Sequence, residues 1–170
     1  MIISEKKLKE LDLILNRDNK LKVTEAIRAL RNEIPFKGAI GLLVSYYDRC
    51  SDNSIMKLIR DFLNDLKDRS AMEEVVSGLR KMIKQETRRM VISSCWQSGL
   101  DYSGYASEFT RYFIECDYMT AVECFTVIES SVNKITRSKK DELIKLIRAK
   151  STAEAGEKSA LIRELISVLS

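Results

Sequence analysis

Residues 86–132 of the chain have the sequence ETRRMVISSCWQSGLDYSGYASEFTRYFIECDYMTAVECFTVIESSV. Apolar residues recur there every three or four positions in three short segments, which is the spacing of amphipathic helices. Gly99 is placed where a helix ends, and Asp101 and Asp117 stand where helices begin. The stretch therefore predicts three helices joined by tight turns.

The composition of the whole chain also favours helices. Its 170 residues are 45% hydrophobic and 32% charged, as in ordinary globular proteins. Six Gly and one Pro are few turn-forming residues for this length. A β-sandwich or a doubly wound α/β fold usually has more of them. We expect one all-α domain covering residues 1–170, long enough to bury a substantial core.

Apolar periodicity predicts ten helices along the chain. They span residues 4–15, 20–32, 36–49, 53–67, 71–83, 86–98, 102–115, 118–132, 139–149 and 157–169. Ser70 and Glu73 have the spacing of a capping box, in which both side chains satisfy free backbone N–H groups. Ser138 and Asp141 have a similar spacing, so we expect a cap at each pair.

Apolar positions recur at an offset of 33 residues. In the second helix of successive pairs, two columns have this spacing: Leu43, Val76 and Phe109, and Tyr46, Leu79 and Tyr112. Three columns in the first helices are Ala26, Ile59, Ile92 and Phe125; Ala29, Phe62, Cys95 and Ile128; and Leu30, Leu63 and Trp96. Identity between the copies is weak, so what repeats is the pattern of buried positions. An ordinary ten-helix bundle without a true repeat is the alternative.

A helix pair of this length cannot bury its apolar face alone, whereas stacked pairs share one continuous core. Residues 86–117 have an early arginine pair, a Gly-bearing turn with an Asp, and a second apolar helix. They resemble one unit of the HEAT-repeat family, and the resemblance covers about residues 19–150. Such units usually carry a Pro where Asp101 stands, although Pro35 occupies that place two units earlier.

The resemblance implies a right-handed α–α superhelix of the armadillo/HEAT-like solenoid type, similar to short single-domain bacterial members. It implies repeats at about 19–50, 52–83, 85–116 and 118–150, with caps at 1–18 and 151–170. It brings no catalytic residue to this chain.

Residues that carry chemistry are scarce. There is no His, and no phosphate-binding loop, dinucleotide fingerprint or zinc-protease motif occurs. The four cysteines lie on or beside apolar stripes, so we expect reduced thiols that pack as small hydrophobes. The adjacent carboxylates Glu73 and Glu74 lie in a first helical turn, where negative charge suits the helix dipole. We therefore expect a protein that is not an enzyme, with no catalytic, cofactor-binding or metal-binding residues.

The second helices of the pairs carry the candidate interaction surface. HEAT-like stacks present these helices on a concave face, and their positions beside the core stripe are mostly small here. These positions are Gly41, Val44 and Ser45; Glu74, Ser77 and Gly78; and Ser107, Thr110 and Arg111. They predict a groove for a partner protein or peptide. The alternative is that small residues only permit tight curvature. The candidate contact residues are Lys37, Ser45, Ser77, Ser107, Thr110 and Arg111.

Two basic clusters define an alternative function, in which a HEAT-like protein binds nucleic acid or processes DNA. The clusters contain Arg80, Lys81, Lys84, Arg88 and Arg89, and Lys134, Arg137, Lys139, Lys140, Lys145, Arg148 and Lys150. The candidate phosphate contacts are Arg80, Lys81, Lys84, Arg88, Arg89, Lys139 and Lys140. The net charge of +4 is mild, and Lys and Arg also favour solvated faces and helix C-termini.

The sequence has no apolar run long enough to cross a bilayer and no signal-peptide pattern near residue 1. We expect a cytoplasmic protein that does not contact a membrane. Its oligomeric state stays open between a monomer and a homo-oligomer joined through the very apolar helix at 36–49.

Overall fold

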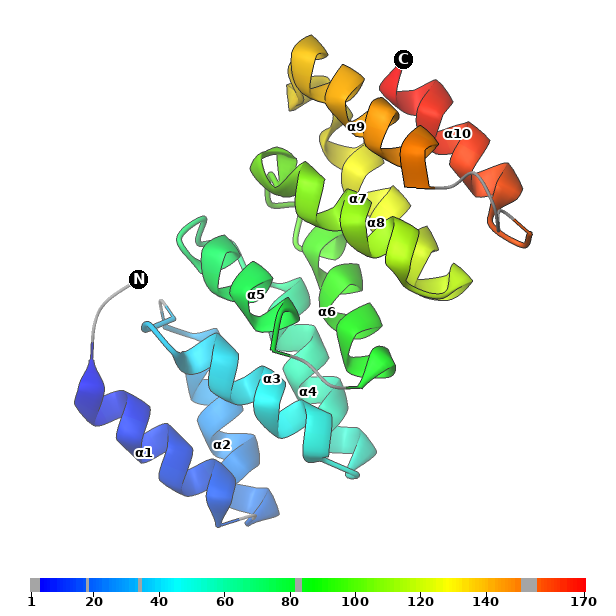
Figure 1. The fold of residues 1–170 in the computed structure, drawn as a ribbon. Helices are drawn as coiled ribbons and strands as arrows, with labels where there is room; N and C mark the ends of the chain where they lie inside the picture. The colour runs from blue at the N-terminus through cyan, green and yellow to red at the C-terminus, as the bar shows by residue number, and fades with distance from the viewer. Residues whose placement is uncertain (1–3, 18, 34, 82–83, 151–155) are drawn as a thin grey trace. The chain divides into compact units, whose positions relative to one another are not determined.

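The computed structural model describes residues 4–17, 19–33, 35–81, 84–150 and 156–170, and its regular secondary structure there is entirely helical (Figure 1). The all-α prediction is therefore confirmed. The α-helices are α1 (Glu5–Asn16), α2 (Lys20–Arg31), α3 (Ala39–Arg49), α4 (Asn53–Asn64), α5 (Ala71–Leu79), α6 (Gln85–Gln97), α7 (Ala106–Glu115), α8 (Tyr118–Ser131), α9 (Arg137–Lys150) and α10 (Ser159–Leu169). Two short 3-10 turns, η1 (Ser103–Tyr105) and η2 (Val132–Lys134), precede α7 and follow α8.

The chain divides into two compact units, which we call unit 1 (residues 1–100) and unit 2 (residues 101–170). The predicted repeat at 85–116 has its first helix, α6, in unit 1 and its second helix, α7, in unit 2. Each unit is therefore described by itself.

In unit 1 each helix packs against the helix two places along the chain. The helices α2, α4 and α6 pack in succession, as do α1, α3 and α5 (Figure 1). Polar contacts follow the same spacing: Asn64 Nδ2 donates to Gln97 Oε1 at 2.8 Å, and Arg49 donates to Asn16 Oδ1 at 2.9 Å, each pair 33 residues apart. The offset seen in the sequence is thus the spacing of neighbouring helices in unit 1.

Unit 2 has the same contacts between alternate helices. α7 packs on α8 and α9, and α10 packs on α8 and α9. The core beneath α7 is aromatic: the rings of Tyr102 and Phe109 meet edge to face with centroids 5.8 Å apart, and Phe113 is fully buried. An edge-to-face pair of this kind adds stabilisation beyond that from burying the two rings.

The apolar columns of the second helices are buried at every predicted position, from Leu43 and Tyr46 to Phe109 and Tyr112. The first helices agree less well with prediction. Trp96 is 38% exposed and Ala29 is exposed, so their placement in buried columns was wrong. The physical reason for Trp96 is that the buried side of α6 is centred on other residues, which are Val91, Ile92 and Cys95. The Trp96 ring lies at the edge of that side.

Two predicted helix ends are confirmed, and a third is not. Asp117 Oδ1 accepts from the Thr120 N–H at 2.7 Å and so caps α8. Gly99 follows α6 with φ +70°, a left-handed conformation that glycine adopts without steric cost. Asp101 was expected to cap the helix predicted at 102–115, which was wrong: α7 begins only at Ala106, and Asp101 Oδ1 accepts from the Ser103 N–H at 3.1 Å in the turn before it.

Both predicted box-type caps were wrong. Ser70 directly precedes α5, but its Oγ donates to Asp68 Oδ1 at 2.8 Å instead of capping the helix. Ser138 lies inside α9, which begins at Arg137, and Asp141 is also within that helix. Asp68 accepts from the Ser70 N–H at 2.8 Å in the turn before α5, and Thr136 Oγ1 accepts from the Lys139 N–H at 3.4 Å near the start of α9.

The apolar side chains of α3 are buried by the packing of unit 1. Ala39, Ile40, Leu43, Tyr46 and Tyr47 are all buried, because α3 contacts α1, α4, α5 and α6. This matches the expectation that such a helix is buried on more than one side. Among the described helices, none is both long and apolar enough to cross a membrane.

Candidate interaction groove between α3 and α5

Small residues were predicted on the second helix of each pair, and those on α3 and α5 line one groove of unit 1. The groove has a volume of about 520 Å³. Its lining is Leu8, Gly38, Gly41, Leu42, Val44, Ser45, Asp48, Glu74, Ser77, Gly78 and Lys81. This set includes all six of the predicted positions on α3 and α5. The 33-residue offset therefore brings both sets to one hollow, as neighbouring helices require.

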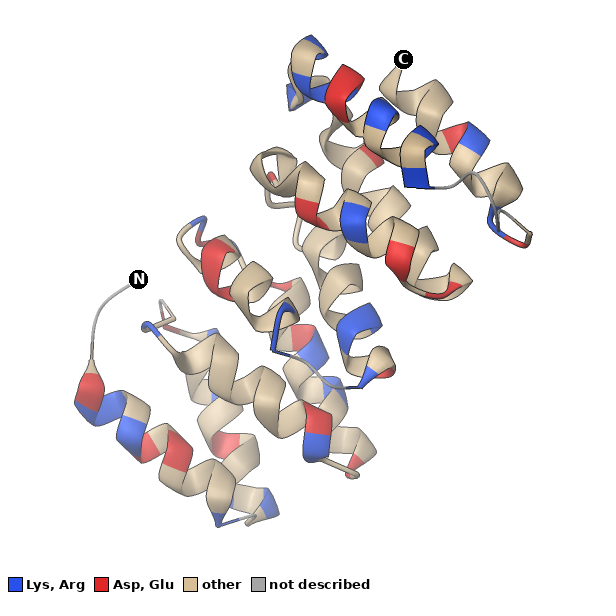
Figure 2. Cartoon of the chain, viewed as in Figure 1, with Lys and Arg blue, Asp and Glu red and all other residues tan. Residues whose placement is uncertain are grey.

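The groove is hollow because glycine and serine leave the space between α3 and α5 unfilled. A Cβ atom added to Gly78 would meet nothing within 4 Å, and one added to Gly41 would lie 3.5 Å from Glu74 Oε1. Ser45 is exposed and Ser77 is half-buried. Figure 2 shows that α3 is uncharged along most of its length, with its charges near the C-terminal end. The groove is therefore mostly uncharged along its α3 wall.

Glu74 joins the two walls of the groove. Its Oε1 accepts from the Gly41 N–H at 2.9 Å, and its Oε2 accepts from the Gly38 N–H at 3.1 Å. Gly38 has φ +94° and immediately precedes α3, so the carboxylate satisfies free N–H groups at the positive end of that helix. Glu74 does lie in the first turn of α5, as predicted, but its hydrogen bonds stabilise the start of α3.

A second hollow of about 420 Å³ extends the groove, because the two share Gly38, Glu74 and Ser77. Lys37 lies on this extension together with Glu73, and both side chains are exposed. The predicted contact residues Lys37, Ser45 and Ser77 are thus brought together in unit 1.

Asp48 adds a carboxylate to the lining of the groove. It lies near the C-terminal end of α3, and its Oδ1 is buried without a hydrogen-bond partner among the described residues. Lys81 also lines the groove and is exposed. Charges of both signs therefore border a largely apolar and small-residue surface.

The remaining predicted contact residues belong to α7 in unit 2. Arg111 is exposed, with its guanidinium carbon 5.4 Å from the centroid of the Tyr112 ring, and Ser107 is half-buried. Thr110 was expected to face outward, but it is fully buried, so this prediction was wrong. The reason is that α7 packs on both α8 and α9, which widens its buried side to include Ala106, Thr110 and Phe113.

Members of the first basic cluster have several different roles. Lys84 Nζ donates to the backbone carbonyl of Asp48 near the end of α3, while Lys81 lines the groove. Arg88 and Arg89 are half-buried, and Arg80 is exposed.

Burial raises the pKa of the Tyr47 hydroxyl, and the nearby guanidinium groups of Arg60 and Arg89 oppose that rise.

Cations of the second basic cluster pair with carboxylates of unit 2. Lys139 contacts Glu142 at 2.8 Å, and Arg137 contacts Asp141 at 3.2 Å. Lys134 contacts Asp101 at 3.4 Å. Lys140 is half-buried. These pairs partly neutralise the cluster, and the nucleic-acid alternative stays a prediction.

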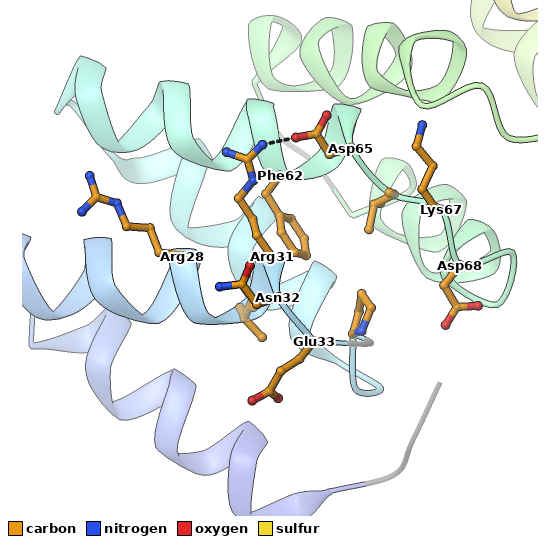
Figure 3. Close-up of a pocket in the computed structure, with 11 residues that line it drawn as sticks. Arg28, Arg31, Asn32, Glu33, Phe62, Asp65, Lys67 and Asp68 are labelled. Atoms are coloured by element: carbon orange, nitrogen blue, oxygen red, sulfur yellow. Dashed lines mark hydrogen bonds and ion pairs between the residues drawn. The ribbon is translucent and has the colours of Figure 1, made fainter.

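A larger hollow, of about 820 Å³, lies where α2 and α4 end (Figure 3). Its charged groups are largely paired with one another or with neighbours. Arg31 points to Asp65 and forms an ion pair with it, and Glu33 pairs with Lys7 at 2.7 Å. Lys67 Nζ donates to the Ser98 carbonyl at 2.6 Å. These groups are engaged in holding the fold, so this hollow is a weaker candidate than the α3–α5 groove.

None of the four cysteines, all of which are described, forms a disulfide: Cys95 and Cys124 are buried, and Cys50 and Cys116 are half-buried. Within the described ranges there is no group of three or more Cys, Asp or Glu residues that could hold a metal ion. Comparison of the chain with models of protein families, with curated proteins and with solved structures gives no match.

Proposed function

We propose that the chain is a HEAT-like α-solenoid that binds a protein or peptide segment in the α3–α5 groove, without catalysing a reaction. The repeated packing of alternate helices supports the solenoid. Polar contacts at the repeat spacing support it as well, such as the Asn64–Gln97 bond over 33 residues.

The observation that carries the functional proposal is the shared lining of the groove. Six positions that the repeat places on two separate helices, among them Gly41, Ser45, Ser77 and Gly78, help to line one hollow of about 520 Å³. Leu42 provides apolar contact, while Asp48 and Lys81 place charged groups beside it. A groove of this kind suits an extended segment or one face of a helix. Glu74 is excluded as a catalytic carboxylate in this proposal, because both its oxygens accept backbone N–H bonds.

The proposal is tested by filling the groove. Ser77→Trp places a large ring in the hollow from α5, and Ser45→Trp does so from α3. The matched control is Ser167→Trp on α10, where Ser167 is exposed in unit 2. Proteins captured from an extract of the native cells are quantified by mass spectrometry, with circular dichroism and thermal unfolding confirming that each variant folds.

The expected result is that a specific set of proteins is captured by the unaltered chain and by Ser167→Trp, but is reduced about tenfold or more by either groove-filling change. Equal capture by all four proteins shows that the groove is not the binding surface.

A further inference from the structure

The outer side of α1 carries apolar residues that the packing of unit 1 leaves uncovered. α1 packs on α2 and α3 through Leu11 and Leu15, which are buried. Leu13 follows Leu11 by two positions, so it points to the opposite side of the helix, about 200° around it. It is 56% exposed, and Leu21 at the start of α2 is 67% exposed. Neither leucine is explained by the core of the unit.

Leu13 does not stand on a flat surface. Together with the half-buried Ile14 it lines a hollow of about 560 Å³ between α1 and the beginning of α2. This hollow is separate from the α3–α5 groove, because no residue lines both. A concave surface with an apolar floor suits the insertion of a side chain from a partner.

The border of this hollow is strongly basic. Four cations, Lys6, Lys9, Arg17 and Lys22, line it against the single carboxylate of Glu10. Among the described residues, none of these four side chains forms an ion pair or a side-chain hydrogen bond. Figure 2 shows the basic segments of α1 beside its acidic ones. The described residues that line the hollow therefore carry a net positive charge around Leu13 and Ile14.

We propose that this hollow binds an acidic segment of another protein, which inserts an apolar side chain over Leu13 and Ile14. Carboxylates on either side of that apolar residue pair with cations such as Lys9 and Arg17. Charge complementarity of this kind sets the choice of partner and the rate of encounter. The site is a second interaction surface of unit 1, and it does not depend on whether the α3–α5 groove is occupied.

Two other occupants fit the hollow less well. A second copy of the chain, docked through the same surface, would bring four cations against four like charges around the same floor. An anionic lipid surface matches the charge but not the shape, since a bilayer is flat and Leu13 and Ile14 line a hollow. Both are outcomes of the test below.

The test uses two fluorescent amphipathic peptides with identical leucines, one with glutamate and the other with lysine at every charged position. Binding to the full chain is followed by anisotropy, and backbone NMR shifts locate the bound peptide. We expect the glutamate peptide to bind and to shift resonances of α1 and the start of α2, and the lysine peptide not to bind.

Variants separate the apolar and the charged parts of the site. Leu13→Ser and the double change Lys9→Glu with Arg17→Glu should each weaken binding of the glutamate peptide about tenfold or more. The matched controls are Met119→Ser, because Met119 is 53% exposed on α8, and Arg163→Glu on the exposed side of α10. Both controls should leave the affinity unchanged.

Three results would overturn the proposal. The first is absence of binding by the glutamate peptide, or equal binding of both peptides. The second is a dimer in light scattering that Leu13→Ser abolishes, which assigns the hollow to a second copy. The third is binding to phosphatidylglycerol vesicles that requires Leu13, with no binding of the peptide, which assigns it to a membrane surface.

Discussion

Helix α3 of unit 1 and helix α7 of unit 2 are both stabilised at one end by a charged side chain from far along the sequence, but the ends and the charges are opposite. The Glu74 carboxylate accepts two N–H bonds at the start of α3. The Lys158 ammonium donates to the carbonyls of Phe113 at 3.1 Å, Ile114 at 2.9 Å and Cys116 at the end of α7. Each charge has the sign that the helix dipole favours at that end.

This comparison shows how a chain with so few Gly and Pro residues satisfies the free backbone groups at its helix ends. Lys84 donates to the Asp48 carbonyl at the end of α3, and Lys67 donates to the Ser98 carbonyl after α6. Lysines therefore repeatedly satisfy carbonyl groups near helix C-termini, where backbone acceptors lack partners within the helix. Some basic residues that look available for phosphate in the sequence are engaged by the fold.

The largest effect is expected when the Glu74 contact is removed. Glu74→Ala leaves the part-buried N–H groups of Gly38 and Gly41 without their charged acceptor, which should lower the free energy of unfolding by about 2–3 kcal/mol. The neighbouring change Glu73→Ala removes an exposed carboxylate and should alter it by less than about 0.5 kcal/mol. Urea denaturation measures both, and equal losses would show that Glu74 has no special role.

Gly38→Ala tests the backbone at the same end of α3. Its φ of +94° disfavours any side chain, and the new Cβ would lie 2.7 Å from Leu8 Cδ1. We expect a loss of about 1–2 kcal/mol in thermal or urea unfolding. Gly78→Ala is the control within α5: its Cβ meets open space, so helix propensity should stabilise the protein by about 0.5–1 kcal/mol. A destabilised Gly78→Ala protein would contradict the hollow described there.

Lys158→Met tests the cationic side of the comparison while keeping most of the apolar stem. Loss of the ammonium from the end of α7 should lower the free energy of unfolding by about 1 kcal/mol. Lys145→Met, at an exposed position of α9, is the matched control and should have little effect. If both variants unfold alike, the carbonyl contacts of Lys158 do not stabilise α7.

The smallest effect is expected at Asp52, whose cap on α4 is local. Its side chain accepts from the Ser54 N–H at 2.9 Å and pairs with Lys20 at 2.7 Å. The hydrogen bond from Lys20, with those from Ser54 and Ile55, holds the pKa of Asp52 well below its ordinary value. The stabilisation it gives is therefore complete above the unfolded pKa of about 4 and is lost as the pH falls below it.

Asp52→Asn retains a capping oxygen but cannot ionise, so the acid-induced loss of stability should become shallower than in the unaltered chain. Urea unfolding at neutral pH and near pH 3 measures the difference. An unchanged pH dependence would show that Asp52 does not contribute to it.

Local signals allowed much of the fold to be predicted. Asp117 and Gly99 mark helix ends through bonds or backbone angles confined to a few residues, and both were predicted correctly. Ser70 was predicted wrongly because Asp68, two residues earlier, offers a stronger acceptor. The roles of Glu74 and Lys158 could not be predicted, because their partners lie 33 to 45 residues away.

The candidate groove was predictable as far as the repeat holds. The 33-residue offset correctly grouped Ser45 with Gly78, but it failed at Thr110, where packing on two neighbouring helices buries the position. The hollow on α1 was missed. Leu13 was its signal, since it is a leucine off the stripe formed by Leu11 and Leu15.

Photo-cross-linking from inside the α3–α5 groove tests the central proposal most directly. A photoreactive benzoylphenylalanine replaces Ser45 on α3 or, as the control, Ser167 on α10, and the chain is irradiated in the native cells. We predict a discrete protein adduct from position 45 that is absent from position 167 and disappears when Ser77→Trp fills the groove. The same adducts from both positions, or an adduct from position 45 that persists in the filled groove, would contradict the proposal.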